Sequence, residues 1–316
     1  MRAMLVAAGF GTRLDPLTQE LPKPAVPVAN QPVAAFALQH LHRFGIRDFV
    51  VNTHHLAAAL RAALEPRVPA DARLRFVHEP TILGTGGGVR NAASQGAGGL
   101  EQELLVFSAK LVFAPDLERL LRVHRDSGAI ATMCLRPLPP DAGFAPVELA
   151  ADGRIRRIRG LPTGAGDGSL RAAMYTGVQV LSPRALAQLP AEGDIIERAY
   201  LPWLERGEVV MGVLDGGDWR DVGVGPQGYL EANLAFAQGQ LRWPGLPEPV
   251  AGSFVAPDAR VGAATRLQAV VAGAGAKIAS GAVLERVVLW PGARAEGELR
   301  DAIVTTGGRV LRLGET

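Results

Sequence analysis

The sequence predicts an α/β protein with a mostly parallel sheet and helices on both faces, followed by a short parallel β-helix. Three observations support this prediction. Short apolar runs alternate with helical stretches through the first 135 residues, which is typical of βαβ units. A glycine-rich loop follows the first apolar run. Beyond residue 253, apolar residues recur every six positions, which indicates a β-helix.

The expected elements follow in order along the chain. Strands are expected at 3–8, 48–53, 74–79, 103–108 and 129–135, and helices at 33–45, 55–66 and 116–128. Asp116 is the expected N-cap of the last of these helices, and Gly128 is its stop. The middle is less regular, with hairpin strands that turn at Asp152-Gly153 and short helices at 182–189, 194–207 and 228–239.

Proline and glycine gather at 242–252, where we expect a linker. It separates a domain at 1–241 from a β-helix at 253–316. At ~18 residues a coil, three or four coils fit into this tail. Because so short a β-helix leaves apolar ends, we expect it to join copies of the chain into a homo-oligomer.

The tail also contains one departure from its six-residue period. Val255, Val261 and Leu267 are six residues apart, and the same step recurs further on. The step from Leu267 to Ile278 is eleven residues, which predicts one irregular coil.

Composition excludes several classes of protein. The chain of 316 residues has a net charge of only +2 and scattered arginines, so no nucleic-acid partner is expected. Cys134 is the single cysteine, which rules out an intramolecular disulfide and a cysteine-based metal cage. The apolar start is too short for a signal peptide, and no run reaches the ~20 residues of a membrane span. We therefore expect a cytoplasmic protein without a membrane partner.

Residues 7–24, AAGFGTRLDPLTQELPKP, form the glycine loop, which combines little side chain with two cations. Gly9 and Gly11 let backbone N–H groups approach an anion, and Arg13 adds a fork that suits phosphate oxygens. Lys23 lies between two prolines, which preset its direction. The loop predicts a polyphosphate site at the carboxyl end of the first strand. It lacks the third glycine of a dinucleotide fingerprint and the Gly-Lys-Ser/Thr of a Walker loop.

The wider segment GFGTRLDPLTQELPKPAVPVANQP resembles the signature of the sugar-phosphate nucleotidyltransferases. The resemblance continues with EPTILGTGGGVRNA at 79–92, MYTGVQVLSP at 174–183 and GDWRDVGVGPQGYLEAN at 217–233. It implies a Rossmann-like sheet, a left-handed β-helix for the tail, and a nucleoside triphosphate and a sugar 1-phosphate as substrates. LGTGGG and the tail are most similar to mannose-1-phosphate guanylyltransferases, and UTP or dTTP with a glucose-type phosphate stays open.

The resemblance also assigns roles to residues. The nucleotide-binding residues are expected to be Ala7, Ala8, Gly9, Gly11, Thr12, Arg13, Asn52, Gly84 and Thr85. Arg13 and Lys23 are the implied catalytic residues, because the reaction needs alignment and charge neutralisation and no protein nucleophile. Thr176 and Gly177 occupy the implied sugar-binding turn.

Metal binding is where the sequence departs from the family, whose members usually hold Mg²⁺ with two aspartates. Asp221 in WRDVG matches the second aspartate, but Lys110 in VFSAKLVF occupies the position of the first. RGLP at 159–162 stands where many relatives carry Glu-Lys-Pro, and DVGVGP is one residue longer than usual. We expect Mg²⁺ as the cofactor, with a weakened metal requirement and slow turnover.

Two functions stay open at this point. The first is an active nucleotidyltransferase, which the presence of Arg13, Lys23 and Asp221 favours. The second is a catalytically impaired member that binds nucleotide or nucleotide sugar and regulates or scaffolds a partner, which Lys110 favours. Acyl transfer by the β-helix is disfavoured, because all six histidines precede residue 125. We expect the β-helix to serve assembly, and its removal to leave nucleotide binding intact.

Overall fold

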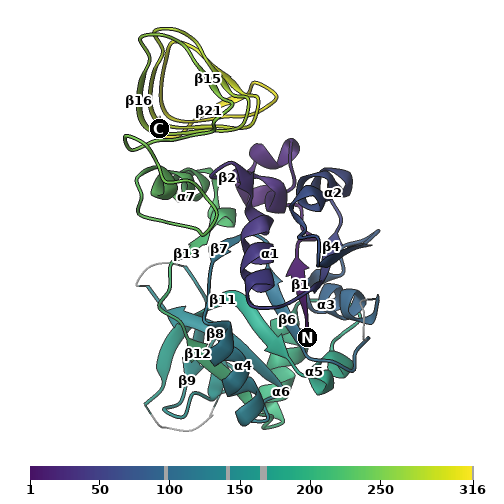
Figure 1. Cartoon of the computed structure of the whole chain (residues 1–316). Helices are drawn as coiled ribbons and strands as arrows, with labels where there is room; N and C mark the ends of the chain where they lie inside the picture. The colour runs from purple at the N-terminus through teal and green to yellow at the C-terminus, as the bar shows by residue number, and fades with distance from the viewer. Residues whose placement is uncertain (96–98, 140–142, 164–168, 315–316) are drawn as a thin grey trace.

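The computed structural model describes residues 1–95, 99–139, 143–163 and 169–314 (Figure 1). An α/β region holds the first 240 residues, and the later strands form a separate layer beside it (Figure 1). Among the described residues, no helix is both long and apolar enough to cross a membrane. The predicted fold class is confirmed for the α/β region, and every strand and helix expected in the first 135 residues is present.

The α/β region is built from thirteen strands and seven α-helices within the described residues. The strands are β1 (Arg2–Val6), β2 (Pro27–Val28), β3 (Gln31–Pro32), β4 (Asp48–Thr53), β5 (Arg73–His78), β6 (Leu104–Ser108), β7 (Leu111–Phe113), β8 (Ala131–Pro137), β9 (Pro146–Leu149), β10 (Ile155–Ile158), β11 (Arg171–Leu181), β12 (Val210–Leu214) and β13 (Trp219–Asp221). The α-helices are α1 (Val33–Arg43), α2 (Ala57–Leu64), α3 (Gly84–Gln95), α4 (Leu117–Asp126), α5 (Pro183–Gln188), α6 (Leu201–Glu205) and α7 (Pro226–Ala237). Short helical turns complete it at η1 (Thr12–Leu14), η2 (Leu17–Gln19), η3 (Lys23–Ala25), η4 (Glu65–Arg67), η5 (Ile196–Tyr200) and η6 (Val222–Val224).

Nine of these strands form the central sheet, in the order β10-β9-β11-β6-β1-β4-β5, with β8 paired to β11 and β12. The block β6-β1-β4-β5 is parallel, whereas β11 runs antiparallel to β6. In the register, Ala3 of β1 lies between Phe49 and Leu105. The carboxyl ends of β1, β4, β5 and β6 therefore meet at one edge of the sheet, which is where ligands bind in such folds.

Helices cover both faces of the sheet, as predicted. Met4 packs in one core with Val89 of α3 and Trp203 of α6. Ala3 and Leu5 point the other way and pack in a second core with residues of α1, α2 and α4. Successive side chains of a strand alternate between faces, so a strand that is apolar throughout needs cover on both sides.

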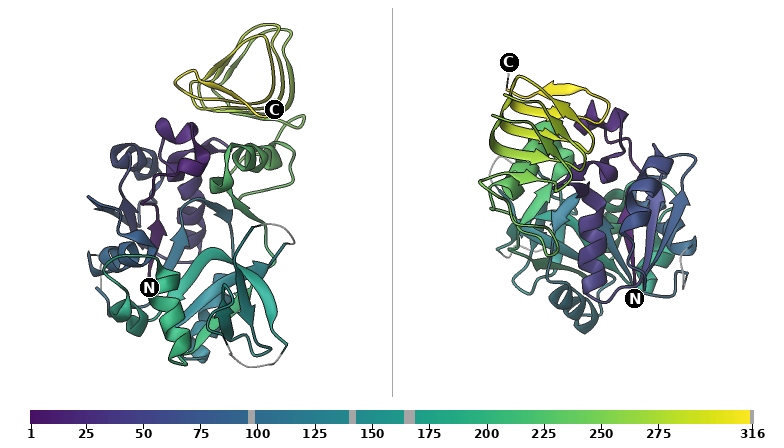
Figure 2. Two further views of the ribbon diagram at one scale, coloured as in Figure 1. Left: turned by 180° about the vertical axis from the view of Figure 1, so that it is seen from behind. Right: turned by 45° about the horizontal axis from the view of Figure 1, so that its top comes forward.

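The C-terminal strands form the stack (residues 253–314), whose turns lie above one another with a triangular outline (Figures 1 and 2). Its strands are β14 (Phe254–Val255), β15 (Arg260–Val261), β16 (Arg266–Ala272), β17 (Lys277–Ile278), β18 (Val283–Leu289), β19 (Arg294–Ala295), β20 (Glu298–Val304) and β21 (Val310–Arg312). One sheet pairs β14, β16, β18 and β20 in parallel, and another pairs β15, β17 and β19 in parallel. The left-handed sense of the coil stays a prediction.

The eleven-residue step in the stack recurs from coil to coil, so the prediction of one irregular coil is wrong. Pairing repeats every 17 residues from β15 to β17 to β19, and from β16 to β18. Ala269 and Arg286 have positive φ angles of 51° and 55°, so β16 and β18 each turn a corner in the middle. Steps of six and eleven residues therefore alternate. The last strand also differs from a continuing coil, because β21 pairs antiparallel with β20.

The stack and the α/β region are packed together through one apolar core. Trp290 of the stack is fully buried, and its Nε1 donates to Oη of Tyr229 in α7 at 2.9 Å. Both side chains belong to a core that includes inward residues of β16, β18 and β20. The expected linker at 242–252 is packed as well, since Trp243 is 6% exposed and its Nε1 donates to Gln39 Oε1 at 2.9 Å. The domain limits at 241 and 253 stay a prediction.

Replacing Trp290 with alanine is expected to lower the free energy of unfolding by about 3–5 kcal/mol, because it empties a buried site between the two parts. Urea unfolding of wild type and variant measures the change. Val261→Ala is the control, since Val261 is 43% exposed and its loss should cost less than about 1 kcal/mol. A similarly small change in both variants would show that this core does not hold the stack in place.

Candidate active site

The glycine loop leaves β1 at the edge of the sheet where the parallel strands end, and Asn52 fixes its base. The backbone N–H groups of Ala7 and Ala8 donate to Asn52 Oδ1 at 2.7 and 3.3 Å. The Asn52 amide donates to Glu79 Oε1 at 2.7 Å, and both side chains are almost fully buried. We expect Asn52 from the sequence to line the nucleotide cleft, but its side chain instead ties the loop to the ends of β4 and β5. Ala7 and Ala8 likewise already donate to a partner within the protein.

Gly11 brings the glycine loop against Lys23. Its φ of 75° lies in the left-handed region, and a Cβ there would lie 2.9 Å from Thr18 Cγ2 and 3.2 Å from Lys23 Cε. Only glycine fits this position without strain. Arg13 follows in η1 and is exposed, while Lys23 is half-buried at the start of η3. Both predicted catalytic cations therefore stand on one tightly folded loop.

Lys23, Lys110 and Asp221 meet around Gly223. A Cβ on Gly223 would lie 2.8 Å from Lys110 Cδ and 3.0 Å from both Lys23 Cδ and Asp221 Oδ1. Strand pairing builds this cluster, because β13 runs antiparallel to β7 with Asp221 opposite Leu111. Segments 111 residues apart in the sequence thus place a lysine beside an aspartate.

Lys110 forms a direct ion pair with Asp221. Its Nζ lies 2.5 Å from Asp221 Oδ2, while Asp221 Oδ1 accepts a hydrogen bond from Gly223 N at 2.7 Å. Both carboxylate oxygens therefore have donors, and the Asp221 side chain is only 6% exposed. Within the described ranges, no group of three His, Cys, Asp or Glu side chains is placed to hold a metal ion. Since Mg²⁺ needs oxygen ligands free to coordinate it, this donor set does not fit a resident Mg²⁺.

A cavity of about 410 Å³ opens beside this ion pair. The predicted site residues that line it are Arg13, Thr85, Lys110, Thr176, Gly177 and Asp221. Those outside the lining are Ala7, Ala8, Gly9, Gly11, Thr12, Lys23, Asn52 and Gly84. Phe144 and Trp219 line it too, with ring centroids 5.9 Å apart. The cavity thus joins cations to an aromatic wall, and its size suits a small phosphorylated ligand.

Gly84 and Thr85 stand at the start of α3, where the helix packs closely on residues 190–195. Gly84 has a φ of 76°, and a Cβ there would lie 2.6 Å from the Gly193 carbonyl oxygen. Gly86 N donates to the same oxygen at 2.9 Å. Thr85 Oγ1 donates to Asp194 Oδ2 at 3.0 Å and accepts from Ile195 N at 2.8 Å. The glycine run therefore permits a close backbone contact beside the cavity.

Thr176 and Gly177 shape the opposite wall. The Thr176 hydroxyl is buried and donates to the Cys134 carbonyl oxygen at 2.8 Å, so it braces β11 against β8. Gly177 has a φ of 94°, and a Cβ there would lie 2.9 Å from Ser108 Cβ. Trp219 Nε1 donates to the Thr176 carbonyl oxygen at 3.2 Å, which fixes the aromatic wall to the same turn.

Residues 2–239 match the family described as Nucleotidyl transferase. This chain belongs to the nucleotidyl transferase family. A mannose-1-phosphate guanylyltransferase of Mycobacterium tuberculosis is 27% identical over 93% of this chain and 81% of its own length. A UTP–glucose-1-phosphate uridylyltransferase of Synechocystis sp. is 26% identical over 73% of this chain, and the match spans 62% of that relative's length. The resemblance to sugar-phosphate nucleotidyltransferases is thereby confirmed.

Solved structures show the same fold as this nucleotidyltransferase. HddC from Yersinia pseudotuberculosis matches with a TM-score of 0.61 and 19% identity, over 74% of this chain and 99% of HddC. HddC complexed with GMP-PN matches with a TM-score of 0.60 and 18% identity over the same shares.

Several site residues of this nucleotidyltransferase escaped the reading of its motifs. Arg159 lines the cavity and begins RGLP, the segment without the family's Glu-Lys-Pro lysine, so a cation is present one position away from the pattern. Glu79 and Trp219 lie inside recognised segments, EPTILG and GDWRDV, but only the structure shows what they contact. Asp194 lies in no recognised motif, and we find no sequence signal for its contact with Thr85.

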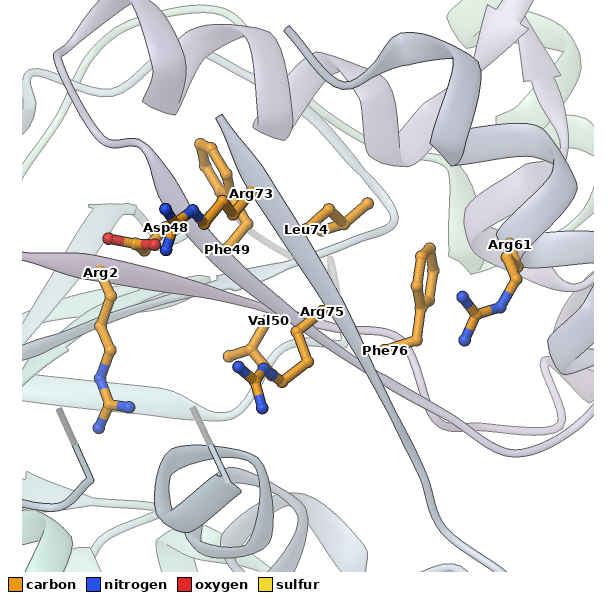
Figure 3. A pocket seen from close by; sticks show the side chains of 9 residues that line it. All are labelled: Arg2, Asp48, Phe49, Val50, Arg61, Arg73, Leu74, Arg75 and Phe76. Atoms are coloured by element: carbon orange, nitrogen blue, oxygen red, sulfur yellow. The ribbon is translucent and has the colours of Figure 1, made fainter. Parts of the chain in front are cut away.

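A second hollow of about 380 Å³ lies at the other end of the nucleotidyltransferase sheet (Figure 3). Arg2, Asp48 and Arg73, which begin β1, β4 and β5, line it. Arg2 Nη1 donates to the Ala93 carbonyl oxygen near the end of α3 at 2.9 Å, an arrangement that stabilises a helix C-terminus. No predicted site residue lines this hollow, so we assign the active site to the cavity beside the glycine loop.

Lys23 is expected to make nucleotide binding by this nucleotidyltransferase depend on pH. Burial lowers the pKa of Lys23 from 10.5 to about 8, and the charges of Lys110 and Arg13 add to the lowering. Below pH 8 the ammonium can pair with phosphate, and above pH 8 it loses its proton. The Kd of GTP, measured by calorimetry, should therefore rise by up to about tenfold between pH 8 and 9. Lys23→Met should lack this rise, and identical profiles for both proteins would assign the titration to another group.

Proposed function

We propose that this nucleotidyltransferase transfers a nucleoside monophosphate from a nucleoside triphosphate to a sugar 1-phosphate. The observation that carries the proposal is the gathering of Arg13, Lys23 and Lys110 beside a cavity sized for a phosphorylated ligand. An oxygen of the sugar phosphate forms a bond to the α-phosphorus, and the bond from that phosphorus to pyrophosphate breaks. The products are a nucleoside diphosphate sugar and pyrophosphate. Alignment and charge neutralisation suffice for this step, so no protein nucleophile is assigned.

The glycine loop holds the nucleotide in this proposal. The backbone of Gly9, Gly11 and Thr12, together with the Arg13 guanidinium, binds the triphosphate and then the pyrophosphate. Lys23 reaches the phosphates near the α-phosphorus, where charge changes most during transfer. Asn52 acts as a positioning residue, which its contacts with the loop base support.

The base and the sugar bind on either side of this loop. Gly84 and Thr85 receive the base, supported by the close backbone packing that glycine permits there. The turn at Thr176 and Gly177 bounds the sugar pocket. Arg159, also in the cavity lining, takes the sugar phosphate in place of the lysine that the family's motif would supply.

Lys110 supplies one fixed positive charge where relatives use a metal. Its ammonium pairs with Asp221 in the free protein and can turn toward phosphate oxygens when substrate binds. A single ammonium neutralises less charge than a divalent ion, so we infer slow turnover and a weakened need for Mg²⁺. This inference deviates from the expectation of a conventional Mg²⁺ cofactor, since the donor set does not fit one.

GTP and mannose 1-phosphate are the substrates we propose. The support is the guanylyltransferase relative, which matches 93% of this chain, including most of the stack. The uridylyltransferase relative keeps UTP and glucose 1-phosphate as the main alternative. Incubation with each triphosphate and a panel of sugar 1-phosphates, with pyrophosphate release as the readout, tests both. Release with no pair of substrates would refute the proposal.

A second candidate function is binding of nucleotide or nucleotide sugar without turnover. The specific observation in its favour is the ion pair between Lys110 and Asp221, which occupies both oxygens of the remaining metal-site carboxylate together with Gly223. Tight nucleotide binding by calorimetry, combined with no pyrophosphate release for any sugar phosphate, would favour it.

We also propose that the stack joins copies of the chain. Val261 and Val310, near its two ends, are 43% and 41% exposed, which supports an apolar contact there. Light scattering of the full chain should give a mass above 33.2 kDa. A monomeric mass at micromolar concentration would contradict assembly.

A further inference from the structure

We propose that Glu20 ties the stack to the glycine loop and is a positioning residue for the nucleotide site, an inference that rests on the proposed function. Glu20 Oε1 accepts a hydrogen bond from Thr305 Oγ1 at 2.6 Å, and Oε2 accepts one from Gly307 N at 3.0 Å. The next turn adds a third contact, since Arg309 Nη2 donates to Gln19 Oε1 at 3.2 Å. The two segments are 285 residues apart in the sequence.

The turn of the stack that meets Glu20 is shaped around its carboxylate. Thr305 is fully buried, and its Oγ1 also accepts from Arg309 N at 3.2 Å, which closes the turn between β20 and β21. A Cβ on Gly307 would lie 3.0–3.2 Å from the carboxyl atoms of Glu20, so a larger residue would push the loop away. Because β21 folds back antiparallel on β20, the turn projects from the stack. The departure from a continuing coil therefore has a role at the active site.

Glu20 stands close to the groups that bind phosphate in our proposal. It lies three residues before Lys23, and its N–H donates to the Leu17 carbonyl oxygen at 3.2 Å within the same folded turn. Thr18 of that turn packs where a Cβ of Gly11 would lie, so movement at Glu20 displaces Gly11 and Lys23 together. Asn52 anchors one end of the glycine loop and Glu20 anchors the other, with Arg13 between them.

This second anchor lowers the entropy that nucleotide binding must cost. A loop that is already held in its binding conformation loses less freedom when a phosphate arrives. The stack then belongs to the nucleotide site, and its removal would weaken nucleotide binding, contrary to what the sequence leads us to expect.

A matched control exists in the same interface. Arg286 of the stack donates to Glu231 of α7 at 2.7 Å, so Glu231 also joins the two parts through a carboxylate. It makes no contact with the glycine loop. Glu20→Ala and Glu231→Ala thus each remove one acid from the interface, and only Glu20→Ala releases the loop.

Two measurements on the full chain test the proposal. Hydrogen exchange without ligand should show faster exchange at residues 9–23 in Glu20→Ala, with wild-type exchange there in Glu231→Ala. Calorimetry with inorganic pyrophosphate at pH 7 should show about tenfold weaker binding for Glu20→Ala only. Glu20→Gln keeps one side-chain oxygen for Gly307 or Thr305, so it should restore part of both effects.

Equal exchange at residues 9–23 in both alanine variants would overturn the proposal, as would equal pyrophosphate affinity. Urea unfolding of each variant separates a general loss of stability from release of the loop. The exchange experiment needs no substrate, so failure of the proposed reaction would leave its result unchanged. The two ideas can therefore fail independently.

Discussion

Replacing Arg13 or Lys23 with alanine is expected to lower kcat/KM for pyrophosphate release by about 10²–10³-fold, the usual effect of removing one preorganised charge from a transition state. Both cations stand on the glycine loop, and Lys23 lies against Lys110 and Asp221 around Gly223. Their loss leaves the charge of the triphosphate uncompensated while the pyrophosphate departs.

Folding should survive both substitutions. Arg13 is exposed, and burial already disfavours the charged form of Lys23, so neither side chain adds charge-based stability. Arg122→Ala is a suitable control, because Arg122 is 59% exposed on α4 and far from the loop in sequence. Wild-type kcat/KM in both loop variants would remove Arg13 and Lys23 from the active site.

The glycine loop could be predicted from sequence because its chemistry is local. Gly11, Arg13 and Lys23 lie within thirteen residues, and prolines and glycines constrain the chain between them. The N-cap at Asp116 is local in the same way, and its side chain accepts from Arg119 N at 2.9 Å as such a cap should.

The helix α3 was not predicted, because its sequence opposes its structure locally. Gly84–Gln95 begins with four glycines among five residues, a composition that favours a loop. The glycines are needed because the chain at 190–193 approaches closely: a Cβ on Gly87 would lie 2.4 Å from the Ala191 carbonyl oxygen. A tertiary contact between segments about 100 residues apart thus overrides helix propensity.

The same limit applies to Asn52 and Glu20. A polar residue at the end of β4 is expected to face ligand, but Glu79 on the neighbouring strand turns the Asn52 amide inward. Glu20 shows no pattern at all in sequence, because its partners lie at the far end of the chain. Contacts of this range become visible only once strand pairing places the segments together.

Lys110→Asp is expected to raise kcat by about tenfold and to make activity depend steeply on Mg²⁺. In the wild type, Lys110 holds Asp221 Oδ2 at 2.5 Å, so the carboxylate is engaged. The substitution frees that oxygen and adds a second carboxylate beside it, across the pairing of β7 and β13. Two carboxylates with substrate phosphates are a donor set that Mg²⁺ accepts.

The central claim is that Lys110 stands in for a metal in an active nucleotidyltransferase, and one titration tests it most directly. Pyrophosphate release from GTP and mannose 1-phosphate is measured over a range of Mg²⁺ concentrations for wild type, Lys110→Asp and the exposed control Lys277→Asp. We predict slow release with a shallow Mg²⁺ dependence for wild type and Lys277→Asp, and faster release with a steep dependence for Lys110→Asp. Fast, steeply Mg²⁺-dependent release by wild type, unchanged in Lys110→Asp, would contradict the claim.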